Sequence, residues 1–443
     1  MLNLKHLVAF FVLSTSYPFT GYTAEVSKQQ ERDFKAYLGR IATAEAIADP
    51  IQRCIAYPDL PGIIWTEEHI KAHCQYHHEQ VLSFKNMQEL AGKGDFLALE
   101  ATFADYQARH ERDENQSEII HRAYEQIRTG EAGDLTAAWL AHSPENAFAI
   151  TARAEYLRSM AWKARGEKYS ADTSKQRLKE MSIIVQQTIP MYQKAIKLNP
   201  ELLPAYIGLL NIAMMDSEGA IERQAREQGL KADPECADLI GNILTSLKPR
   251  WGGDYKEMLE FTESTVKPSI KNRPLNGQYM ANIFEDIIDA YTSKNSDDSA
   301  LIHAISEGLK YGANEDLLEE AESIYDKTGR NDLGYMYVAQ VVRFRGGVKE
   351  DYNNLGSILA DFEYYPTALK FFEKALELKP NDPYAQFHLA RTYMKLRNYD
   401  TAIEYAKKSR SSPIHRLDSQ LALIESLLRL ERWDEALPEA VQT

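Results

Sequence analysis

The chain has 443 residues, of which 44% are hydrophobic and 26% are charged, and its 65 acidic residues outnumber its 51 basic ones. This composition supplies enough apolar side chains for a folded core and excludes a disordered chain. The acidic surplus, without any stretch that interleaves Lys and Arg with aromatic residues, argues against nucleic acid as a partner and against polybasic attachment to anionic lipid.

The N-terminus has the pattern of an export signal. Lys5 precedes an apolar run at 7–13, and the small residue Ala24 precedes the charged Glu25. The apolar run is too short to cross a bilayer core of about 30 Å as a helix. We therefore predict a cleaved signal peptide at 1–24, a periplasmic or secreted mature chain, and no integral membrane span in that mature chain.

The segment HIKAHCQYHH, at 69–78, packs four histidines and a cysteine into ten positions. Thr66 is a typical N-cap residue, and the two glutamates after it suit the positive start of a helix. The apolar positions that follow recur at helical spacing. We therefore predict one helix from 67 to about 84.

The histidines on this helix do not converge on one point. His69 and His77 are separated by about 12 Å of helix rise, whereas the ligands of one zinc ion all lie about 2 Å from it. Only neighbours such as His73 and His77 are placed to chelate one ion. We predict no metal and no cofactor, and we keep a transition metal on His73 and His77 as the alternative.

The three cysteines predict one disulfide and one thiol. The predicted helix places Cys74 on its apolar face, and the connector from Cys54 contains two prolines and a glycine that turn the chain back. A Cys54–Cys74 bond would close a loop of about 20 residues and stabilise the fold by about 3 kcal/mol. Cys236 is then predicted to be a small buried thiol just inside a repeat helix.

A period of 34 residues runs through much of the chain. In the middle it is degenerate, with YQKAIKLNP ending at Pro200 and REQGLKADP at Pro234. Near the C-terminus it is clear, because small residues recur at Ala368, Ala402 and Ala436, where paired antiparallel helices approach closely. The predicted C-terminal repeats are 349–382, 383–416 and 417–443, the last one cut short.

These spacings resemble tetratricopeptide repeats, and they predict an all-α fold, a right-handed solenoid of helical hairpins. The predicted regions are the signal peptide at 1–24, an N-terminal helical region with two cysteines at 25–135, degenerate helical repeats at 136–348 and tetratricopeptide repeats at 349–443.

A second resemblance covers roughly residues 50–270. Its motifs are CIAYPDLPG at 54–62, Trp65, HCQY at 73–76, AWKARG at 161–166, LLPAYIGLL at 202–210 and KPRWGG at 248–253. Together they resemble the bacterial family named domain of unknown function 4034. The resemblance implies a helical domain in exported proteins and no assigned chemistry, so it transfers no catalytic residue.

The tetratricopeptide analogy predicts which residues face the concave groove. They are Asn353, Ser357, Tyr384, Phe387, Arg391, Leu421 and Glu425. Asn353 stands where relatives that grip a C-terminal carboxylate carry their first Lys, so that clamp is not expected. We predict instead a partner with apolar side chains over Tyr384 and Phe387 and one acidic group paired with Arg391.

We therefore predict an exported, non-enzymatic scaffold or adaptor that binds a protein or peptide partner in a concave groove. The alternative is a metal-handling protein or a hydrolase, with its site near the histidine-rich helix. The short last repeat leaves Trp433, Leu437 and Val441 thinly covered, and we expect a second copy of the chain, in a homodimer, or the partner to dock there.

Overall fold

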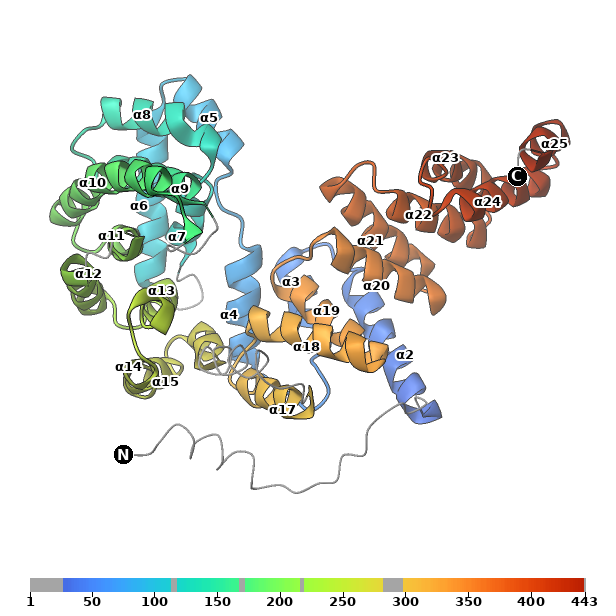
Figure 1. Cartoon of the computed structure of the whole chain (residues 1–443), viewed down its shortest axis with the longest axis horizontal. Coiled ribbons are helices and arrows are strands. Elements are labelled where there is room, and N and C mark those ends of the chain that lie inside the picture. The colour runs from blue at the N-terminus through green and yellow to red at the C-terminus, as the bar shows by residue number, and fades with distance from the viewer. Residues whose placement is uncertain (1–26, 113–117, 167–171, 216–218, 282–297, 442–443) are drawn as a thin grey trace. The chain divides into compact units, whose positions relative to one another are not determined.

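The computed structural model describes residues 27–112, 118–166, 172–215, 219–281 and 298–441 (Figure 1). The predicted signal peptide at 1–24 lies outside this part of the chain. Within it every regular element is a helix, which confirms the all-α class, and strands are absent there. In the same described ranges, no helix is long and apolar enough to cross a membrane.

The described helices form two compact units. The first contains residues 27–64, 298–306 and 315–441, and the second contains 65–281 and 307–314. The N-terminal region predicted at 25–135 is therefore divided between the two units, because its first helices pack against C-terminal ones.

The second unit is a stack of antiparallel helix pairs. Its helices are α4 (Glu67–His78), α5 (Phe84–Gly92), α6 (Phe96–Arg112), α7 (Ile119–Glu125), α8 (Gly133–His142), α9 (Ala147–Arg165), α10 (Lys175–Leu198), α11 (Leu203–Met215), α12 (Gly219–Ala232), α13 (Ala237–Ser246), α14 (Tyr255–Phe261) and α15 (Lys267–Ser269). Helix α11 packs against α10 and α12. A β-carbon on Gly208 would lie 2.3 Å from the ring of Tyr192, so only glycine allows α10 and α11 to approach this closely.

The helix predicted from 67 to about 84 is shorter than expected. The Thr66 side chain caps its start by accepting a hydrogen bond from the His69 N–H, as predicted. The helix ends at His78, because Glu79 takes an extended ψ of 132°. Ser83 then caps the next helix, α5, by accepting from the Asn86 N–H, so the prediction was wrong beyond His78.

A buried carboxylate organises the centre of the second unit. The Glu155 side chain is 1% exposed and pairs with Arg158 at 2.6 Å and Arg128 at 2.7 Å. The Tyr192 hydroxyl donates to its other oxygen at 2.7 Å. Burial alone would raise the pKa of Glu155, but the two guanidinium groups and the Tyr192 hydroxyl lower it to about 2. The residue is therefore ionised, and each oxygen has a partner.

The first unit contains the clear repeats. Its helices are α2 (Lys28–Ala44), α3 (Pro50–Ala56), the first part of α17 (Asp298–Leu309), α18 (Glu315–Thr328), α19 (Asn331–Phe344), α20 (Lys349–Asp361), α21 (Tyr365–Leu378), α22 (Pro383–Lys395), α23 (Tyr399–Ser409), α24 (Arg416–Arg429) and α25 (Trp433–Val441). The three C-terminal pairs are α20 with α21, α22 with α23 and α24 with α25. Phe372 of α21 fills the space beside Gly356 of α20, where a β-carbon would lie 2.7 Å from its ring.

The two N-terminal helices of this unit pack on α19. Gln340 donates both to the Tyr37 hydroxyl and to the Pro58 carbonyl, each at 2.8 Å. The Arg343 side chain is 0% exposed and donates to the Cys54 carbonyl at 2.8 Å and to Asp59 at 2.7 Å. These bonds join segments nearly 300 positions apart, so the N-terminus supplies the neighbour that the repeat array needs at α19.

We expect Arg343→Met to lower the free energy of unfolding of the first unit by about 3 kcal/mol, because it removes the donor from the buried Cys54 carbonyl and from the half-buried Asp59 carboxylate. Arg345→Met is the matched control, because its side chain is 40% exposed and pairs with Glu315 at the surface. The control should change the free energy by less than about 1 kcal/mol. Urea unfolding measures both, and equal losses would contradict the role given to Arg343.

The low pKa of Glu155 predicts a pH-dependent stability. Because the folded value of about 2 is below the ordinary 4.5, the ionised carboxylate contributes about 3 kcal/mol above pH 4.5, and this is lost as the pH falls towards 2. Glu155→Gln should therefore destabilise the protein more at neutral pH than near about pH 3. Urea unfolding at both pH values tests this, with the exposed Glu145→Gln as control. A difference that does not shrink in acid would contradict it.

Candidate functional site

A groove of about 750 Å³ lies along the C-terminal repeats, between the first helices of neighbouring pairs. Its lining residues are Phe387, Arg391, Met394, Lys395, Arg397, Tyr399, Asp418, Leu421, Ala422, Glu425 and Arg429. Most of them belong to α22 and α24, because the first helix of each tetratricopeptide-type pair faces the concave side. The groove belongs wholly to the first unit.

Phe387 lines this groove, and it belongs to an aromatic cluster with Tyr384 and His415. The rings of Phe387 and His415 stack with centroids 5.2 Å apart, and the Tyr384 ring lies 5.7 Å from that of His415. The Arg391 guanidinium lies over the Phe387 ring, 5.6 Å from its centroid. Leu421, which is 53% exposed, adds an apolar side chain from α24. The lining therefore offers apolar contact beside an accessible cation.

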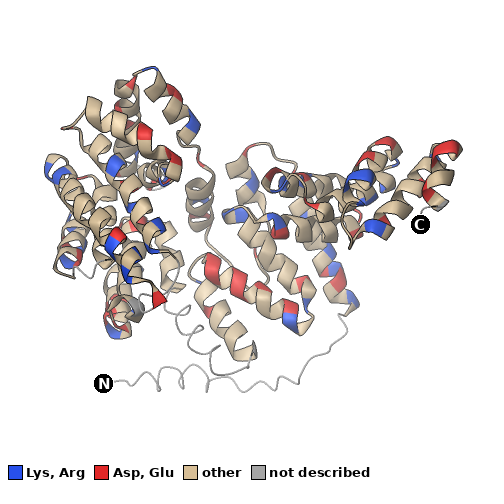
Figure 2. Cartoon of the chain, turned by 45° about the horizontal axis from the view of Figure 1, so that its top comes forward, with Lys and Arg blue, Asp and Glu red and all other residues tan. Residues whose placement is uncertain are grey.

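The charges of the groove are mostly basic, although the chain as a whole is acidic. Its lining has four basic and two acidic side chains. Arg429 lies 3.4 Å from Glu425. Among the described residues, no ion pair involves the other three basic side chains of the lining, Arg391, Lys395 and Arg397. Figure 2 shows Lys and Arg interspersed with Asp and Glu along these repeats. The groove therefore suits a ligand with negative charge.

Burial keeps a neighbouring histidine neutral. His388 packs against Tyr384 with ring centroids 4.2 Å apart. Its burial, with the positive charge of Arg391 and the nearby His415, lowers the pKa of His388 to about 4. The imidazole therefore adds aromatic surface behind the groove and no positive charge at neutral pH.

The structure brings together four of the seven residues predicted for partner binding. Phe387, Arg391, Leu421 and Glu425 line the groove. Tyr384 stands behind it in the aromatic cluster. Ser357 and Asn353 are outside the lining, and Asn353 is 5% exposed.

Asn353 has a structural partner in the same unit. Its side-chain amide donates to the Asp382 carboxylate at 2.9 Å, and that carboxylate also caps α22 by accepting from the Ala385 N–H. The sequence analogy placed Asn353 on the groove because it considered only the position in the repeat. The amide turns inward instead, because the buried Asp382 carboxylate is stable only with hydrogen-bond donors around it.

The histidine-rich helix contributes mainly to packing. His69 donates from Nδ1 to the Pro274 carbonyl at 2.8 Å, and its Nε2 accepts from the Ala313 N–H at 3.1 Å, so both ring nitrogens are used by the backbone. His73 is 1% exposed, and its ring centroid lies 6.0 Å from that of His77. The metal alternative at His73 and His77 stays a prediction.

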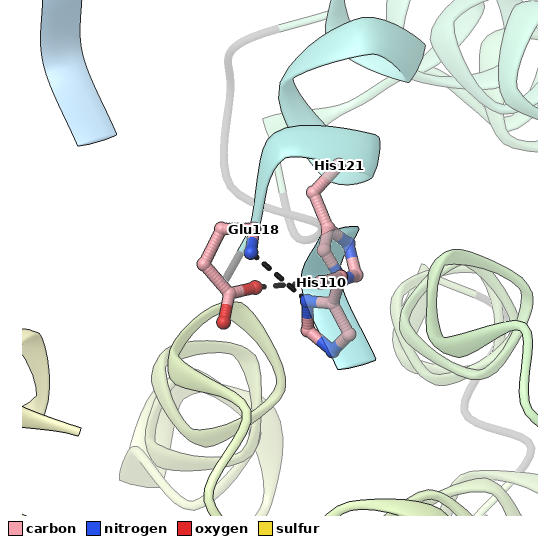
Figure 3. A group of neighbouring side chains, drawn as sticks. All are labelled: His110, Glu118 and His121. Atoms are coloured by element: carbon pink, nitrogen blue, oxygen red, sulfur yellow. Dashed lines mark hydrogen bonds and ion pairs between the residues drawn. The ribbon is translucent and has the colours of Figure 1, made fainter. Parts of the chain in front are cut away.

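A second group of polar residues, which the sequence analysis did not find, lies inside the second unit (Figure 3). The group contains His110, at the end of α6, and Glu118 and His121, at the start of α7. Each offers one atom that could bind a metal ion, and these three atoms lie within 4.8 Å of one another. All three are buried, and the Glu118 backbone N–H donates to His110 Nδ1 at 3.0 Å. Nothing in the sequence pointed to this group. His110 is eight positions before Glu118, and the three residues match no known metal-binding motif.

Cys236 belongs to the same group. Its thiol donates to Glu118 Oε2 at 3.3 Å and lies 3.7 Å from His121 Nε2. The thiol is free and 0% exposed, as predicted, although it stands at the N-cap of α13 and not inside the helix. Burial raises the pKa of Cys236 and lowers that of His121, so neither is charged at neutral pH in these surroundings.

The comparison with protein families matches only the C-terminal part. Residues 362–439 match the family model described as anaphase-promoting complex, cyclosome, subunit 3. This match agrees with the helical pairs from α21 to α25, so the region is a tetratricopeptide-type array. No curated protein matches the sequence.

Several solved structures have a low similarity to this chain. The crystal structure of MamA protein has 22% identity and a TM-score of 0.31, covering 36% of this chain and 87% of that one. PilF of Pseudomonas aeruginosa has 14% identity and a TM-score of 0.25, covering 59% and 84%. The Cut9–Hcn1 hetero-tetramer of APC/C has 9% identity and a TM-score of 0.28, covering 90% and 73%.

The pairing of Cys54 with Cys74 stays a prediction that thiol counting tests. Both side chains are buried, at 2% and 0% exposed. Labelling the unreduced protein in denaturant and chelator should detect one thiol, Cys236. Labelling after reduction is the control and should detect all three. Three reactive thiols without reductant would show that the disulfide is wrong.

Proposed function

We propose that this chain is an exported, non-enzymatic scaffold that binds a protein or peptide partner along the groove of its C-terminal repeats. The groove between α22 and α24 carries this proposal. It combines exposed apolar surface with basic groups that have no ion-pair partner among the described residues, and helical repeats of this type commonly bind peptides on such a surface.

The groove favours a partner segment with two kinds of side chain. An apolar side chain would bury the exposed Leu421 and the edge of Phe387, which gains free energy by removing apolar surface from water. An acidic side chain beside it would pair with Arg391, whose position over the Phe387 ring is already set by packing. A pre-positioned cation loses little conformational entropy on binding, so it is suited to a central contact.

The compartment and the N-terminal region are part of the same proposal. The pattern at 1–24 supports export, and a Cys54–Cys74 bond would form in an oxidising compartment. The motifs between 50 and 270 support a relation to the domain of unknown function 4034. We also propose that Trp433 and Leu437, which are 62% and 70% exposed, contact a second copy or the partner.

We expect charge reversal in the groove to abolish partner capture. Arg391→Glu should lower the amount of partner retained at least about tenfold, because it replaces attraction by repulsion at a central contact. Tyr384→Ala with Phe387→Ala should do the same, by removing the Phe387 ring from the lining and the Tyr384 ring from the aromatic cluster behind it. The measurement is affinity capture from an envelope extract with the full mature chain, followed by identification and quantification of the proteins retained.

Lys407→Glu is the matched control, because it reverses one exposed charge on α23 outside the groove. It should retain the partner at the wild-type level. Thermal unfolding checks that each variant is folded. Equal capture by the wild type, both groove variants and the control would place the binding surface elsewhere and contradict the proposal.

A further inference from the structure

Three donor atoms in the buried group of the second unit form a compact triangle. His121 Nε2 and Glu118 Oε2 are 3.4 Å apart, and Cys236 Sγ lies 3.3 Å from that oxygen and 3.7 Å from that nitrogen. The first two donors are drawn in Figure 3. The donors come from α7 and from the start of α13, so the triangle joins two helices that are distant in sequence.

The triangle has the dimensions of one face of a tetrahedral zinc site. Zinc bonds of about 2.0 to 2.3 Å to nitrogen, oxygen and sulfur place neighbouring ligand atoms about 3.3 to 3.6 Å apart. Imidazole, carboxylate and thiolate are all ligands that zinc accepts, and a thiolate favours it over magnesium or calcium. We propose that His121, Glu118 and Cys236 bind a zinc ion, and that a water molecule completes the four-coordinate site. His110 stays outside the ligand set, because its Nδ1 accepts from the Glu118 N–H and its Nε2 lies 3.4 Å from the Asp233 carboxylate.

The charges of the group fit a divalent cation. When zinc binds, the Cys236 thiol loses its proton to solvent, and the thiolate and the Glu118 carboxylate together balance the two positive charges of the ion. The His121 ligand remains neutral. A buried site with no net charge avoids the large cost of an uncompensated ion in the protein interior.

The surroundings of the group have the features of a supporting shell. The other oxygen of Glu118 accepts from the Ala237 N–H at 2.8 Å, which leaves Oε2 for the ion. Asp238 lies 3.9 Å from His121 Nδ1, on the far side of the ring from the triangle, and accepts from the Tyr76 hydroxyl at 3.1 Å. The 3.9 Å separation is longer than a hydrogen bond. Zinc on Nε2 would leave the Nδ1–H to donate to this carboxylate, and such a contact orients the ring of a histidine ligand.

The backbone at Glu118 gives independent support. Its φ is +77°, a left-handed conformation that costs free energy in a residue other than glycine. This conformation directs a fully buried carboxylate towards Cys236 and His121. Because the donors are buried, the ion would have a structural role, holding the start of α7 against the start of α13.

Elemental analysis of the full mature chain, produced without a histidine tag, tests the site. We expect one zinc ion per chain. Cys236→Ser and Glu118→Gln should lower the zinc content at least about tenfold, and Asp238→Asn should weaken binding about 10- to 100-fold. The double variant His73→Gln with His77→Gln is the control and should keep its zinc.

Cobalt supplies a readout that needs no substitution. Refolding the wild-type protein with Co²⁺ should give the visible bands of tetrahedral cobalt and a near-ultraviolet sulfur-to-cobalt band, because Cys236 supplies a thiolate. Far-ultraviolet circular dichroism checks that the variants fold. Wild-type protein that contains no zinc and gives no sulfur-to-cobalt band would overturn the proposal. A zinc content that follows His73 and His77 would also overturn it.

Discussion

A pair of antiparallel helices cannot bury both of its faces by itself, so each pair depends on a neighbour. In the first unit this constraint is met at α19 by helices from the other end of the sequence. Arg343 makes the arrangement specific, because its buried guanidinium needs the Cys54 carbonyl and Asp59 as acceptors. Apolar packing alone would allow α2 and α3 to shift along α19, whereas these directional bonds hold them in one position.

The second unit shows two ways to keep a carboxylate inside a helical core. The charge of Glu155 is balanced by two guanidinium groups, and a tyrosine hydroxyl donates to its other oxygen, so this carboxylate needs no further partner. Glu118 accepts instead from a backbone N–H and from the weakly donating thiol of Cys236, and among the described residues no guanidinium group pairs with it. The contrast explains why a cation is proposed beside Glu118 and not beside Glu155. A buried carboxylate that no guanidinium group balances gains more from a metal ion than one that is already paired.

The groove and the proposed zinc site have different roles in this protein. The groove depends on exposure, since Leu421 and Arg391 act only if a partner reaches them. The zinc site depends on burial, since its donors are held by packing and its effect is on stability. Mutations in the groove of the first unit are therefore expected to reduce partner capture. Mutations of the zinc ligands in the second unit are expected to reduce metal content and stability. An experiment that contradicts one of the two proposals leaves the other unaffected.

The sequence alone was sufficient for features that repeat or act locally. The period of 34 residues predicted the helical pairs from α20 to α25, and Thr66 correctly marked the start of α4, because small residues and caps act through neighbours in sequence. Position in the repeat also predicted Phe387, Arg391, Leu421 and Glu425 as groove residues, since solenoid geometry repeats with the sequence. Position in the repeat failed at Asn353, whose amide turns to a buried carboxylate. The apolar spacing after Thr66 failed beyond His78, where the extended Glu79 ends the helix and Ser83 caps the next one. Only the tertiary structure decided which distant residues meet, as Glu118 meets Cys236 and Cys54 meets Arg343, because such contacts depend on how whole helices pack and leave no periodic trace in the sequence.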